Sequence, residues 1–207
     1  GIALGSLMPV FPALADRFAT AHIILNAYGW IGLTAFGTLV LLWPTVLHAR
    51  MPDTADAAAR HALPILVTGL VIAAIGPLVD VPPLIALGMV VWLAGAAHLA
   101  IEAAREWRAM PPGTFAGWSL AASFIWVVIA GITLGIQSLT APDWASLRAD
   151  YLMVLGPLVV GFAVQLLTGA MSYLLPVVAL GSPAAAKVGA EVLDRGAAFR
   201  VAAFNGA

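Results

Sequence analysis

The sequence predicts an all-α integral membrane protein, a polytopic helical bundle of about six transmembrane helices plus the start of a seventh. Hydrophobic residues make up 62% of the 207-residue chain and charged residues only 9%. The mean hydropathy is +1.02. Apolar runs of about 20 residues, the length that crosses a bilayer, are separated by short segments that carry most of the charge. A soluble domain of this size does not have this composition.

The apolar runs divide the chain into seven segments. The predicted segments are 1–14, 21–47, 61–79, 83–104, 114–139, 149–178 and 197–207. Because the first and last segments are apolar up to the chain ends, we interpret them as parts of longer spans. The sixth is so long that it must tilt or project from the bilayer. We therefore expect residues 1–207 to form one transmembrane domain that is a fragment of a longer polypeptide.

The loops on the two faces of this bundle differ in basic residues. One face carries two of them, Arg17 and Arg148, and the other face carries six. Those six are Arg50, Arg60, Arg105, Arg108, Lys187 and Arg195. Short loops rich in Lys and Arg remain in the cytoplasm, so the second face is predicted to be cytoplasmic.

The composition also excludes several classes of site. Cysteine is absent, which excludes disulfides, iron–sulfur clusters and a cysteine-ligated copper site within these residues. No basic cluster suggests nucleic acid as a partner. No carboxylate lies in the middle of a predicted span, which argues against the acidic relay of an ion-coupled pump.

His22 is the candidate functional residue, because the charge bias places it at the extracytoplasmic end of a span while the other three histidines lie toward the opposite side. Asn26 and Gly29 follow it at helical spacing. Imidazole is a common axial ligand of haem, a glycine lets a flat ring approach, and the Asn26 amide is one turn away to orient the ring. The alternative is a histidine that only meets water at a helix end.

Two further helix faces combine small and polar residues. They are Ser119, Ser123, Trp126, Thr133 and Gln137 in one span and Gly161, Gln165, Thr168 and Ser172 in the next. Such faces usually hold membrane helices together. The alternative interpretation is a polar-lined cavity for quinone or protons.

Two motifs resemble a known family. The first is HIILNAYGWIGLT at 22–34, followed by GT at 37–38 and WPT at 43–45. The second is GAMSYLLPVV at 169–178, followed by LDRG at 193–196. Together they resemble the membrane domain of bacterial copper oxidases and copper nitrite-reductase-like proteins, and more distantly haem-copper membrane proteins.

The resemblance implies the later half of a membrane domain in the bacterial cytoplasmic (inner) membrane, as part of an oxidoreductase. Electrons would pass from quinol or haem b to cupredoxin domains of the same polypeptide, with copper only in parts outside this chain. His22 would be the metal ligand, and Asn26 and Gly29 would contact the cofactor. The family often has a second histidine where Ile24 stands, so the second haem ligand is expected outside this chain. The alternatives are a non-catalytic anchor for copper domains and a small-molecule carrier.

Overall fold

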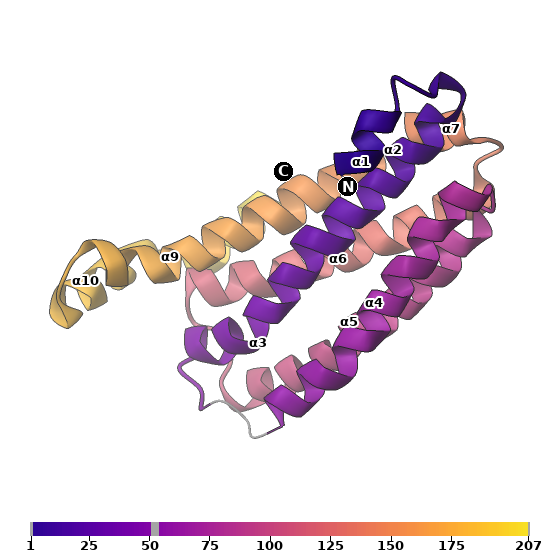
Figure 1. Ribbon diagram of the computed structural model, residues 1–207. Helices are drawn as coiled ribbons and strands as arrows, with labels where there is room; N and C mark the ends of the chain where they lie inside the picture. The colour runs from indigo at the N-terminus through magenta and orange to yellow at the C-terminus, as the bar shows by residue number, and fades with distance from the viewer. Residues whose placement is uncertain (1, 51–53, 207) are drawn as a thin grey trace.

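The computed structural model describes residues 2–50 and 54–206, and all regular structure in this part of the chain is helical (Figure 1). Five helical stretches are long and apolar enough to cross a membrane: Pro12–Val46, Ala55–Val79, Pro83–Ala109, Phe115–Thr140 and Trp144–Ala179. They confirm the prediction of an all-α, multi-pass membrane protein.

The first and last of these stretches are composite. The first joins η1 (Pro12–Leu14), α2 (Ala15–Ile23), the π-helical segment η2 (Ile24–Leu33) and α3 (Thr34–Val46). The last joins α7 (Trp144–Ala149), α8 (Leu152–Gly156), the π-helical segment η3 (Pro157–Val164) and α9 (Gln165–Ala179). Between them lie α4 (Ala55–Val79), α5 (Pro83–Ala109) and α6 (Phe115–Thr140).

The predicted count of six spans and the start of a seventh is confirmed for five. In segment 1–14, described from residue 2 on, the structure has α1 (Ile2–Leu7) and η1, and α1 packs against α2. After α10 (Pro183–Leu193), segment 197–207 forms α11 (Ala197–Gly206), which packs against α6. At about 1.5 Å per residue, neither short helix crosses a hydrocarbon core of about 30 Å.

The helix ends follow from local sequence. Asp80 ends α4 in the left-handed conformation, with φ 66°, and the prolines at 82 and 83 prevent the helix from continuing. Thr114, Asp143 and Ser182 are the N-caps of α6, α7 and α10, and each side chain accepts a hydrogen bond from a backbone N–H of the first turn. Such caps satisfy amides that have no partner within the helix.

The tightest packing is between α4 and α5. A Cβ at Gly69 would lie 2.4 Å from the backbone nitrogen of Trp92, and one at Gly88 would lie 2.3 Å from that of Ala73. Glycine therefore sets the distance between these two helices, as small residues do in membrane bundles. The rings of Tyr28 and Phe36 pack edge-on against the indole of Trp92 in the core.

Ion pairs gather at the end of the bundle where α2, α7 and the α4–α5 turn meet (Figure 1). Arg17 pairs with Asp80 at 3.4 Å and donates to the carbonyl of Pro77, while the indole N–H of Trp144 donates to Asp80. The α3–α4, α5–α6 and α9–α10 connections lie at the opposite end (Figure 1). We call these the Asp80 end and the basic end. The loops thus alternate between two ends, as the apolar segments predict.

Candidate functional site

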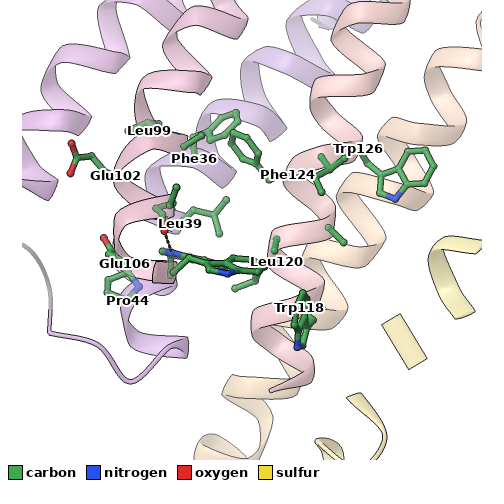
Figure 2. A pocket seen from close by; sticks show the side chains of 18 of the residues that line it. Phe36, Leu39, Pro44, Leu99, Glu102, Glu106, Trp118, Leu120, Phe124 and Trp126 are labelled. Atoms are coloured by element: carbon green, nitrogen blue, oxygen red, sulfur yellow. Dashed lines mark hydrogen bonds between the residues drawn. The ribbon is translucent and has the colours of Figure 1, made fainter. Parts of the chain in front are cut away.

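A cavity of about 940 Å³ lies near the basic end, between α3, α5, α6 and α11. Figure 2 shows α3 contributing Phe36, Leu39 and Pro44 on one side and α6 contributing Phe124 and Trp126 on the other. Small side chains on the facing surfaces of α5 and α6 leave the space open. They are Ala100, Ala103, Ala104, Ala121 and Ala122. We call this space the tryptophan cavity, after the four indoles that line it.

The indoles of the tryptophan cavity are held in place by contacts with one another and with the backbone. Trp43 stacks on Trp107 with ring centres 6.0 Å apart, and Trp118 meets Trp107 edge-on at 5.2 Å. The Trp43 N–H donates to the carbonyl of Ala103 at 3.1 Å, and the Trp126 N–H donates to the side-chain oxygen of Asn205. These walls therefore present rigid aromatic surface.

Glu106 is the polar group buried in the lining of the cavity. Its side chain comes from the last turns of α5 (Figure 2), and the residue is only 9% exposed. Its Oε2 atom is buried and has no hydrogen-bond partner. A buried polar atom without a partner costs about 1–3 kcal/mol relative to one that is paired.

Glu102, one turn before Glu106, is engaged by the protein itself. It forms an ion pair with Arg105 and accepts a hydrogen bond from Thr54 at 3.3 Å. The two carboxylates therefore differ in their interactions: Glu102 has an ion-pair and a hydrogen-bond partner, and Glu106 Oε2 has none. The cavity lining therefore holds one unpaired acceptor, which a turn of the Glu106 side chain toward the cavity would present to a bound molecule.

The residues predicted as the cofactor site, His22, Asn26 and Gly29, lie on α2 and η2, and His22 is toward the Asp80 end. The Asn26 amide donates to the backbone carbonyl of His22 at 2.7 Å and so secures a helical turn. A Cβ at Gly29 would lie 3.0 Å from a methyl group of Leu70. Gly29 therefore gives room to α4, and both residues have packing roles of their own.

The structure does not test whether His22 binds a haem. Its imidazole lies 3.5 Å from where a Cβ of Gly5 would be, so the ring lies beside α1. In residues 2–50 and 54–206, no group of three histidine or acidic side chains could hold a metal ion. The assignment of haem b to His22 stays a prediction.

The small-and-polar face of the last long helix packs against α6, in agreement with the helix-packing interpretation. Gly161, Gln165 and Gly169 are buried. Thr168, in contrast, is exposed and donates to the carbonyl of Val164 within its own helix. Both polar atoms of the Gln165 side chain are buried and have no hydrogen-bond partner.

Sequence reasoning did not find the tryptophan cavity. It did not single out Glu106 or the four indoles as a binding site. One signal was available: positions 103, 106 and 107 fall on one side of a helix that also carries alanines at 100 and 104. That pattern places a carboxylate and an indole on a helix face lined with small side chains.

Comparison with known proteins identifies no family: no family model matches the chain, and no curated protein or solved structure is significantly similar to it.

Proposed function

We propose that this chain is the membrane module of a copper-oxidase-like redox protein and that the tryptophan cavity binds its quinol. The redox part of this proposal is supported by the motif resemblance at 22–45 and 169–196. The quinol part is supported by the cavity. Its volume lies within the range of small-molecule sites, about 300–1,000 Å³, and such sites combine apolar walls with few polar groups.

The single observation that carries the quinol assignment is the unpartnered carboxylate oxygen of Glu106 in an aromatic, apolar cavity. A quinol is a flat aromatic ring with hydroxyl donors and an apolar tail. One hydroxyl would donate to Glu106, the ring would pack on the indoles of Trp107 and Trp118, and the tail would follow the apolar walls. The hydrogen bond would pair a donor with a charged acceptor, and the ring and tail would contact aromatic and apolar surface.

The wider assignment extends this binding role to a redox chain. In this proposal the bundle is the later part of a membrane domain of about six spans and the start of a seventh in the bacterial inner membrane. The basic end faces the cytoplasm, and cupredoxin domains of the same polypeptide lie outside. The bilayer and these domains are the partners of the module.

Photolabelling of the full-length protein tests the quinol assignment. A short-chain quinone that carries an azide is bound in membranes, activated by light, and its cross-links are mapped by mass spectrometry. We expect labelled peptides from α3, α5 and α6 at the basic end, and competition by unlabelled quinol. Replacing Ala121 by Trp should fill the cavity and remove the label, whereas Ala94→Trp, at an exposed position of α5, should leave it unchanged.

The competing function is a non-catalytic anchor for copper domains. Under this alternative, another helix of the full-length polypeptide fills the tryptophan cavity, so the probe labels no cavity residue. A reduced-minus-oxidised visible spectrum of the full-length protein gives a second criterion. A redox module that contains haem b shows the haem bands, and an anchor shows none.

A further inference from the structure

A second cluster of functional groups lies outside the tryptophan cavity. His61 on α4 and His98 on α5 face each other with ring centres 6.3 Å apart and ring planes at 77°. His61 is exposed and His98 is half-buried. The pair therefore lies at the outer edge of the α4–α5 seam, toward the basic end, where an ion can reach it from outside the bundle.

The helices that carry these rings are held at a fixed separation. A Cβ at Gly95, one turn before His98, would lie 2.8 Å from the side chain of Leu66. Further along the seam, Gly69 and Gly88 allow the two backbones to come into direct contact. Because the backbones cannot separate or slide without losing this packing, the fold sets the distance between the two backbone positions that carry the imidazoles.

The ring separation is close to that of two imidazoles bound to one metal ion, and from the edge-to-face arrangement the rings need only turn until a nitrogen of each points to the ion. A metal–imidazole bond is about 2.0 Å long, so the ring centres are roughly 5 Å apart in tetrahedral and roughly 6 Å apart in linear coordination. A linear arrangement needs only two ligands and is a common geometry of Cu(I). The described residues supply two, since no third histidine or acidic side chain completes a cluster there.

We propose that His61 and His98 bind one Cu(I) ion at the basic end of the α4–α5 seam. Imidazole nitrogens suit copper, and a site with two protein ligands favours an ion that two ligands satisfy over ions that need four or more. Glu102 lies one turn after His98 on the same helix face, and its charge favours a cation nearby. The site is separate from the quinol proposal and from the copper expected outside this chain.

The test is an anaerobic titration of the tag-free protein with Cu(I), in competition with a chromophoric Cu(I) chelator. Omitting the polyhistidine tag is essential because a tag binds copper itself. We expect one Cu(I) per chain, and X-ray absorption should show two nitrogen neighbours. His61→Ala and His98→Gln should each weaken binding by more than about 100-fold, since even losing an outer-shell partner costs 10–100-fold.

His48→Ala is the matched control, because His48 is an exposed histidine at the same end that contacts Tyr173 rather than another histidine. It should leave Cu(I) affinity unchanged. His61 is exposed, so its alanine variant should fold, and circular dichroism verifies this for both variants. The proposal is overturned if the folded wild type binds no Cu(I). It is equally overturned if either variant retains full affinity, or if binding is spread over all histidines.

Discussion

Gly161 of η3 lies directly against the indole of Trp126 on α6: a Cβ at position 161 would come within 2.3 Å of the Trp126 Cγ atom. The same indole donates its N–H to Asn205 of α11 and lines the tryptophan cavity. One glycine therefore fixes a ring that joins three helices and forms part of a cavity wall.

Replacing Gly161 with leucine should destabilise the protein. The new side chain has no space unless the indole or the backbone moves, and such overpacking costs about 1–3 kcal/mol. Thermal unfolding in detergent measures the effect. Val160→Leu is the control because Val160 is exposed and 53% accessible. Equal melting temperatures for the two variants would show that the helix contact at position 161 does not stabilise the bundle.

The membrane orientation is tested by reporter fusions. Six basic residues in the loops of one face and two in those of the other predict that the basic end is cytoplasmic. A phosphatase reporter fused after Arg108 should be inactive, and one fused after Trp144 should be active, because phosphatase requires export. The opposite pattern would reverse the orientation and place the tryptophan cavity on the extracytoplasmic side.

The Asp143 cap of α7 should weaken in acid. The Ser146 amide donates to this carboxylate at 2.7 Å, and that hydrogen bond holds the Asp143 pKa below its usual range. A lowered pKa in the folded state means that the stabilisation is present at neutral pH and is lost as the pH falls through that pKa. Protection of the 144–149 amides against hydrogen exchange should therefore fall in acid more than it does in the Asp143→Asn variant, whose amide oxygen remains an acceptor. If both proteins respond to acid in the same way, the charge of the Asp143 carboxylate does not contribute to capping α7.

Much of this fold was predictable because bilayer thickness sets helix length. Each of the five confirmed spans contains an apolar run long enough to cross the hydrocarbon core, and Pro83 marks a boundary where the structure has one. The extra turns of the first long helix were not predicted, because they contain Asp16 and Arg17. These charges are compensated by partners distant in sequence, Arg148 and Asp80, and pairings of this kind cannot be seen in a local pattern.

The candidate sites were less predictable because they depend on which side chains of neighbouring helices pack against each helix face. Spacing placed His22, Asn26 and Gly29 on one stripe, but it did not show that Leu70 occupies the space beside Gly29. Likewise, the tryptophan cavity arises where α3, α5, α6 and α11 meet, and its lining comes from positions more than 100 residues apart. Only the packing of these helices shows that Glu106 is buried.

Glu106 should reduce the stability of the ligand-free protein. Its Oε2 atom is buried and unpaired, so replacing the carboxylate with an apolar side chain of similar size removes a desolvation cost of about 1–3 kcal/mol. We expect Glu106→Leu to unfold at a higher temperature than the wild type. Glu102→Leu, which removes an ion pair with Arg105, should bring no such gain. A lower melting temperature for Glu106→Leu would show that Glu106 serves the fold rather than a ligand.

The most direct test of the quinol assignment is the affinity of the full-length protein for a short-chain quinol, followed by quenching of tryptophan fluorescence. A hydrogen bond to a buried carboxylate contributes about 1.5–3 kcal/mol. Glu106→Leu, which leaves no acceptor, should therefore raise the Kd about tenfold or more, while Glu102→Leu, at a carboxylate already paired with Arg105, should leave it within about twofold. Equal affinities of the wild type and Glu106→Leu, or quenching by quinol that persists when Ala121→Trp fills the cavity, would contradict the quinol assignment.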